Sequence, residues 1–177
     1  MGKSKWSLDL SHCSLDFSLK HMMISTVRGT FQQFEADIDA DPTDLTTADV
    51  TFTIDASSID TRDANRNEHL KSADFFEVEK YPHITFHKTS IARTSDDEYT
   101  MTGDLSMHGV TQPVTFRVTA EGQGKDPWGN ERAGFSAETS INRKDYGLHW
   151  NAMLETGGVL VGEQVKIALH LSAVKQA

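Results

Sequence analysis

Eight histidines are the residues of this chain that could most readily do chemistry, because neutral imidazole binds metal ions and titrates near neutral pH. The zinc patterns HExxH, HxH and a close cysteine pair do not occur. His83 and His87 would share a face of an extended strand about 13 Å apart, too far to hold one metal ion. A metal-dependent or hydrolytic enzyme would therefore need distant histidines to meet. The candidates for such a site are His21, His69, His108 and His149.

Other catalytic patterns are also missing from the sequence. The segment GDLSMHG places a serine near a histidine but lacks the G-x-S-x-G spacing of a nucleophile elbow. The segment GQGKDPWG has two glycines without the G-x-G-x-x-G spacing of a dinucleotide site. We therefore expect a protein that is not an enzyme and has neither a metal nor a cofactor, with the histidine-dependent enzyme as the alternative.

Two polar groupings could hold the head group of a ligand. They lie in TRDANRNEHLK (61–71) and INRKDYGLHWN (141–151), where guanidinium and amide donors could point at oxygen atoms. The head-group candidates are Arg62, Arg66, His69, Asn142 and Arg143. The alternative is that Arg62 or Arg143 pairs with Asp63 or Asp145 and only braces a loop.

Period-two alternation dominates the elements that must position these groups. In CSLDFSLK (13–20), apolar side chains alternate with polar ones, and the same pattern occurs at 27–38, 49–55, 83–91, 99–107, 113–120, 131–141 and 164–171. About eight strands with one apolar face each indicate an all-β antiparallel sandwich or, more readily, a closed eight-stranded barrel. Such a barrel can be solid or can hold one small ligand, and the pattern does not decide between the two.

One short helical insert interrupts the strands at about residues 64–74. Asn65 followed by Glu68 reads as a capping box that opens a helix over residues 66–73. A lone helix in an all-β chain is expected to cover a barrel mouth.

Composition limits the function classes. The 177 residues suit one domain, and no apolar run is long enough to span a membrane as a helix. Net charge is −9 without a Lys/Arg stripe, which argues against binding nucleic acid or anionic membranes. The single cysteine, Cys13, allows no internal disulfide and shares a strand face with apolar residues, so we expect it to be buried. No apolar signal-peptide segment opens the sequence, and a cytoplasmic location is the expectation.

Five segments in order along the chain resemble the YceI family: WSLDLSHCSLDFSLKHMMISTVRGTF, TRDANRNEHLKSADFFEVEKYPHITF, GDLSMHGVTQPVTF, DPWGNERAGFSAETSINRKDYGLHWN and VGEQVKIALHL. The resemblance implies a single lipocalin-like barrel domain over residues 1–177 that encloses a long apolar tunnel. It also implies a polyisoprenoid ligand, such as a quinone tail or a prenyl pyrophosphate, with fatty-acid derivatives as a further class. Family members are binders rather than established enzymes, often homodimers and often exported, and this chain would depart from them in the last respect.

Inward-facing apolar residues would then line the tunnel, although strand parity does not separate a tunnel wall from a sealed core. Met22, Met101 and Met107 could adapt to different tails. The phenylalanines near residue 75 would close one end as a lid. The predicted tunnel residues are Phe17, Leu19, Met22, Phe31, Phe52, Ile54, Leu70, Phe75, Phe76, Phe86, Leu105, Phe116, Val118, Phe135, Ile141, Ile167 and Leu169.

Overall fold

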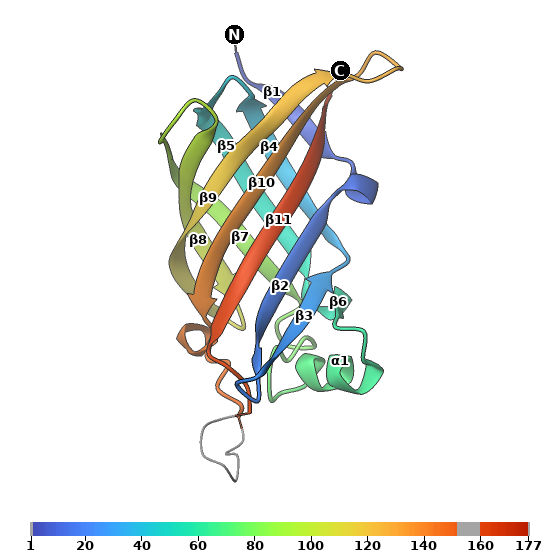
Figure 1. The fold of residues 1–177 in the computed structure, drawn as a ribbon, viewed down its shortest axis with the longest axis vertical. Coiled ribbons are helices and arrows are strands. Elements are labelled where there is room, and N and C mark those ends of the chain that lie inside the picture. The colour runs from blue at the N-terminus through green and yellow to red at the C-terminus, as the bar shows by residue number, and fades with distance from the viewer. Residues whose placement is uncertain (1, 152–159, 177) are drawn as a thin grey trace.

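The computed structural model describes residues 2–151 and 160–176. Figure 1 shows one antiparallel sheet rolled into a barrel, with a helix beneath one end and both chain termini at the other. The strands are β1 (Ser4–Leu8), β2 (Ser14–His21), β3 (Ser25–Phe31), β4 (Phe34–Asp41), β5 (Asp44–Asp55), β6 (Ile59–Asp60), β7 (His83–Arg93), β8 (Glu98–Met107), β9 (Val110–Lys125), β10 (Glu131–Asn142) and β11 (Gln164–Lys175). The helices are α1 (Ala64–Lys71) and the short 3-10 turns η1 (Leu10–His12), η2 (Ala56–Ser58) and η3 (Arg143–Tyr146).

The expected eight-stranded antiparallel barrel is confirmed. The ring runs β1-β4-β5-β7-β8-β9-β10-β11 and closes where β1 pairs with β11, at Trp6 opposite Lys175. Closure gives every strand of the ring two neighbours, which satisfies backbone groups that an open sheet would leave unpaired.

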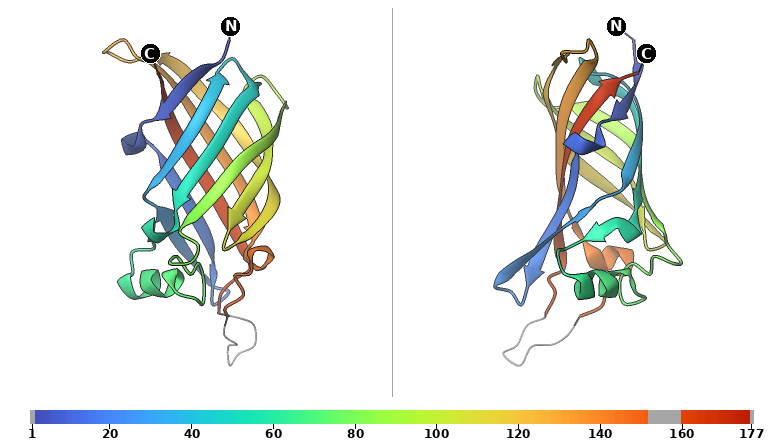
Figure 2. Two further views of the ribbon diagram at one scale, coloured as in Figure 1. Left: turned by 180° about the vertical axis from the view of Figure 1, so that it is seen from behind. Right: turned by 90° about the vertical axis from the view of Figure 1, so that its right-hand side faces the viewer.

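Two strands of the barrel each consist of two of the named segments. One consists of β1 and β2, which both pair with β11. The other consists of β4, which pairs with β1, and β3, which pairs with β2. The strand expected at 27–38 is therefore divided between β3 and β4. At the junction, the Gln32 amide donates to Ser58 O and the Asp55 amide donates to Gln33 O, so the backbone turns toward η2 instead of continuing the ladder. Figure 2 shows the β2–β3 hairpin splaying away from the barrel axis at the end where α1 lies.

The helical insert lies where it was expected, but its cap differs. The Asp63 side chain accepts from the Arg66 amide at 3.1 Å, so Asp63 is the N-cap and the predicted Asn65–Glu68 capping box is wrong. Because the two Asx residues are only two positions apart, either could have started the helix. After Lys71 the chain folds back, with the Phe76 amide donating to Leu70 O.

Glycine allows close packing at one point of the wall. A Cβ atom on Gly103 of β8 would collide with the Phe86 ring and with the His87 backbone oxygen of β7. The barrel therefore needs a residue without a side chain there.

The single cysteine is less enclosed than its strand parity predicted. Cys13 lies between η1 and β2, packs against the core and is only half-buried. Its thiol donates to Ser172 O at 3.5 Å.

Candidate functional site

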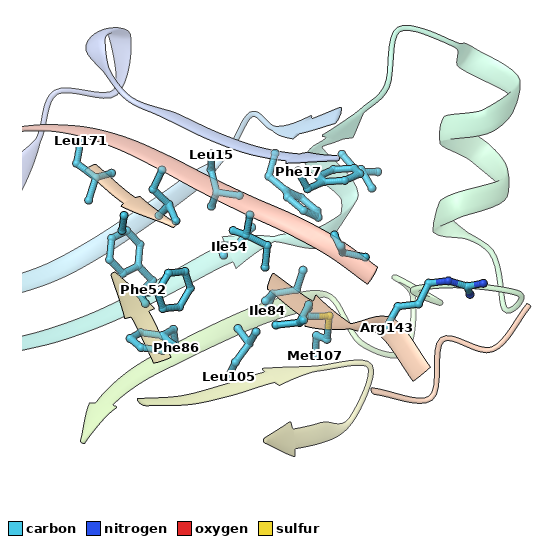
Figure 3. A pocket seen from close by; sticks show the side chains of 18 of the residues that line it. Leu15, Phe17, Phe52, Ile54, Ile84, Phe86, Leu105, Met107, Arg143 and Leu171 are labelled. Atoms are coloured by element: carbon cyan, nitrogen blue, oxygen red, sulfur yellow. The ribbon is translucent and has the colours of Figure 1, made fainter. Parts of the chain in front are cut away.

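The barrel interior is a cavity of about 340 Å³. Because alternate residues of each strand point inward, the wall is built almost entirely from apolar side chains (Figure 3). It extends from Trp6 and Ala173, near the chain termini, to His69 and Trp150, near α1. Well-packed protein interiors leave few voids larger than a water molecule, so a space of this size marks a hollow barrel.

The structure brings the predicted tunnel residues together at this cavity, with the exception of Met22. Their contact with a ligand stays a prediction, but their position on the wall is observed. The residues at the cavity are Phe17, Leu19, Phe31, Phe52, Ile54, Leu70, Phe75, Phe76, Phe86, Leu105, Phe116, Val118, Phe135, Ile141, Ile167 and Leu169. Met101 and Met107 also line it.

Met22 lies in the turn between β2 and β3 instead of on the wall. Its side chain is 45% exposed and its φ is 55°, because the strand ends at His21 and the alternation ends with it. Met23 and Ile24 continue this exposed apolar tip.

Sequence reasoning missed two tryptophans of the wall. Trp6 lies on β1, where its indole N–H donates to Ala40 O at 3.1 Å across the β1–β4 pair. The short alternation in SKWSL could have indicated this strand. Trp150 comes from the segment after η3, where no periodic pattern exists to reveal it.

Aromatic rings pack together at the α1 end of the cavity, where a lid was expected; that they close this end stays a prediction. The Phe75 and Trp150 ring centroids are 5.5 Å apart, and the His69 ring meets both edge-on at 5.2 and 4.7 Å. Phe76 packs edge-on against Phe31 of β3 at 6.0 Å. These contacts link the segment after α1 to the barrel wall.

Arg66 and His69 bring polar groups from α1 to this end of the cavity. The Arg66 Nε donates to the Thr61 hydroxyl at 2.9 Å, and its Nη2 donates to Thr61 O at 2.7 Å. The His69 Nε2 lies 2.8 Å from an Asp74 carboxylate oxygen. Both side chains are thereby oriented by neighbours close in sequence.

Arg143 is the buried charge of the site, with 3% of its surface exposed. It donates from Nε to Gly162 O at 2.8 Å, from Nη1 to Leu148 O at 2.6 Å and Trp150 O at 3.0 Å, and from Nη2 to Val161 O at 3.2 Å. Burial lowers the pKa of its guanidinium from the ordinary value. The alternative of an ion pair with a nearby aspartate is therefore wrong for Arg143, because its partners are backbone carbonyls.

Arg62 and Asn142 are not part of the cavity wall. Arg62 belongs to a groove on the outer surface, where its amide donates to an Asp60 carboxylate oxygen at 2.9 Å. The Asn142 side chain accepts from the Lys144 amide at 3.0 Å and so caps η3. Both were expected at the mouth because they belong to segments that are rich in guanidinium and amide donors.

The histidine candidates do not form a metal site in the described part of the chain, where no group of three or more His, Cys, Asp or Glu could hold an ion. His108 bonds through Nδ1 to Tyr146 O at 3.0 Å, and His149 is exposed. His21 lines the cavity near the β2–β3 turn. Among the described residues, no helix has the length and apolar character needed to cross a membrane.

A family model described as the YceI-like domain matches residues 6–173, nearly the whole barrel. The chain belongs to the YceI family. UPF0312 proteins of Pseudomonas putida and Staphylococcus epidermidis are each 42% identical to it, over 77% and 92% of this chain and 71% and 93% of theirs.

Solved structures share the YceI barrel. BcnA of Burkholderia cenocepacia has a TM-score of 0.81 and 27% identity, with 93% of this chain and 98% of that chain covered. A Campylobacter jejuni YceI protein has a TM-score of 0.76 and 28% identity, covering 90% and 91%. A polyisoprenoid binding domain from Saccharophagus degradans has a TM-score of 0.75 and 16% identity over 98% and 99%, a likeness of fold alone. The YceI barrel described above is thus a shared architecture.

Proposed function

We propose that this protein binds a long apolar amphiphile inside the barrel, and that it carries, stores or sequesters this molecule without chemistry of its own. The ligand class is a polyisoprenoid, such as the tail of a quinone or a prenyl pyrophosphate. The observation that carries the proposal is the apolar cavity within a closed barrel.

The affinity follows from the wall's chemistry. An isoprenoid tail has no hydrogen-bonding groups, and transfer of its surface from water contributes about 25 cal/mol per Å². The wall along the barrel axis offers aliphatic and aromatic side chains, which suit such a tail. Met101 and Met107, with flexible thioethers, can follow the kinks of an isoprenoid.

Two further arguments support a binder of this class. The Saccharophagus degradans neighbour is described as a polyisoprenoid binding domain, and the same fold encloses an apolar space here. No Asp, Glu, Ser or Cys is among the described lining residues, so the wall offers neither a carboxylate nor a serine or cysteine nucleophile to the histidines. A fatty-acid derivative is the second candidate, because a straight alkyl chain also lacks hydrogen-bonding groups and also packs against apolar side chains. A cytoplasmic location and a homodimer stay predictions.

Native mass spectrometry of protein purified without detergent, followed by organic extraction, tests the proposal. We expect a long-chain lipid at near-stoichiometric occupancy, and uptake of added polyprenol or quinone by protein that has been delipidated. A cavity that is empty after purification and takes up neither compound would refute it. Metal analysis and chelation test the enzyme alternative, which requires a bound ion and an activity that the chelator removes.

A further inference from the structure

The charged and titratable side chains at the cavity are predominantly of one sign. Apart from Tyr99, those on the wall are basic, and no Asp or Glu is among the lining residues. The chain as a whole has the opposite bias, with 26 acidic residues against 17 Lys and Arg. The basic residues of the wall are Lys20, His21, Arg66, His69 and Arg143. A cavity that received charges at random from this acidic chain would show the reverse.

These residues gather at one end, which we call the basic end. Arg66 and His69 lie on α1, and Lys20 and His21 end β2, where His21 bridges to Val161. Figure 3 shows Arg143 at the side of the cavity that faces α1, apart from the cluster of apolar side chains. The opposite end, near Trp6 and the chain termini, is apolar. The cavity is therefore polarised along its length.

The positive charge at the basic end has little compensation from carboxylates. Arg66 donates hydrogen bonds to Thr61 from Nε and Nη2 and makes no ion pair among the described residues. Its Nη1 group is therefore available to bind a ligand. Arg143 is buried and bonds only to carbonyl oxygens, so its charge stays in place. Glu163, whose negative charge acts on Arg143, bonds to Lys144. Asp74, which contacts His69, is not part of the wall.

The positively charged basic end favours an anionic group in the ligand. Charge-assisted hydrogen bonds from guanidinium to phosphate or carboxylate are shorter and stronger than neutral ones, and they strengthen where water is excluded. A neutral head, such as a hydroxyl or a quinone ring, would leave the positive charge at the basic end without a counter-charge.

We infer that the ligand's head group is an anion, a phosphate, diphosphate or carboxylate, held at the basic end with Arg66 as its direct donor. This assignment rests on the proposed lipid function. The tail then lies along the apolar wall toward Trp6, and acidic amphiphiles are selected over neutral ones with the same tail.

Two pairs of probes with matched tails test this assignment and separate its two sources of negative charge. The first pair is geranylgeranyl diphosphate and geranylgeraniol, and the second is palmitate and hexadecanol. Binding to delipidated protein is followed by tryptophan fluorescence, because Trp6 and Trp150 line the cavity. At low ionic strength we expect the anion of at least one pair to bind roughly tenfold tighter than its alcohol, with the advantage shrinking as salt rises.

Arg66→Gln should reduce the preference for the anion roughly fivefold and leave the affinity for the alcohol within about twofold. Retained alcohol binding also shows that the variant is folded. Lys20→Gln is a second variant with a smaller effect in the same direction. Arg117→Gln is the matched control: it removes one positive charge from the exposed outer face of β9, where Arg117 pairs with Glu138, and should leave the preference unchanged.

The two hypotheses fail differently. If anions and alcohols bind equally in both pairs, the anionic head is wrong and lipid binding stands. If anions are preferred but Arg66→Gln behaves like Arg117→Gln, the assignment of Arg66 as the direct donor is wrong. If neither member of either pair binds, the proposed lipid function is wrong and this assignment falls with it.

Discussion

Replacing Arg143 with methionine should destabilise the protein strongly, although sequence reasoning placed this residue in a head-group site. The side chain is 3% exposed and donates to four backbone carbonyls, at 2.6 to 3.2 Å. Hydrogen bonds that involve a charged group contribute about 1.5–3 kcal/mol each to stability. The cost of removing the guanidinium from water offsets part of this contribution. Removing the guanidinium leaves four carbonyl groups without this donor, and an unsatisfied buried polar group costs about 1–3 kcal/mol, less where water can replace the donor. A total of about 3–5 kcal/mol follows, similar to the cost of breaking a buried ion pair.

We therefore expect the free energy of unfolding of Arg143→Met to fall by about 3–5 kcal/mol, a large part of the 5–15 kcal/mol that is typical of a folded domain. Urea denaturation followed by circular dichroism measures this change. Arg143→Lys keeps the charge but lacks the planar fork that reaches several carbonyls, so it should recover less than about half of the loss.

The control is Arg117→Gln, which breaks an exposed ion pair and should cost less than about 1 kcal/mol. If Arg143→Met unfolds within about 1 kcal/mol of the parent protein, the carbonyl network does not organise this end of the barrel, and the reasoning is refuted.

Three further predictions follow from other parts of the structure. Phe52→Trp should keep the free energy of unfolding within about 1 kcal/mol while weakening lipid binding, as measured by denaturation and titration; a loss of about 1–3 kcal/mol without any effect on binding would indicate a packed core instead. The Asp126 carboxylate accepts from Arg132, which lowers its pKa to about 2, so its stabilisation is present above pH 4 and is lost as pH falls toward 2. Urea midpoints measured across that range should fall less for Asp126→Asn, and an equal fall would contradict the assignment. Gly103→Ala should lower the free energy of unfolding by about 1–3 kcal/mol because its methyl group meets β7, whereas Gly124→Ala, with open space at its Cβ position, should be nearly neutral in the same assay.

Strand parity was enough to place most of the cavity wall, because a period of two leaves only two choices of face and one of them is apolar. It failed at Met22, where the strand had already ended. It also could not show that the barrel is hollow, since an inward Phe52 looks the same in a packed core. That distinction depends on how far apart opposite walls lie, which is a property of the closed ring.

The polar residues were harder to predict from the sequence. Arg143 is oriented by carbonyls of residues up to 19 positions away, and carbonyls carry no residue type that a pattern could detect. Arg62 and Arg66 are four positions apart in one segment, yet the first lies on the outer surface and the second at the cavity. Arg62 precedes the helix cap Asp63, whereas Arg66 lies within α1, and the sequence analysis had placed the cap at Asn65.

The seam between β1 and β11 has a consequence for how the protein forms. The hairpins β7–β8, β8–β9 and β9–β10 join neighbours in sequence, whereas the seam joins Trp6 to Lys175. Contacts between such distant residues form slowly, because the intervening chain must lose its freedom before they can stabilise anything. Until β11 has been synthesised the ring cannot close, and a nascent chain exposes its phenylalanines to water. Under the proposed function, a lipid that is present at that moment is enclosed by the closing wall, and the cavity acquires its first occupant during folding.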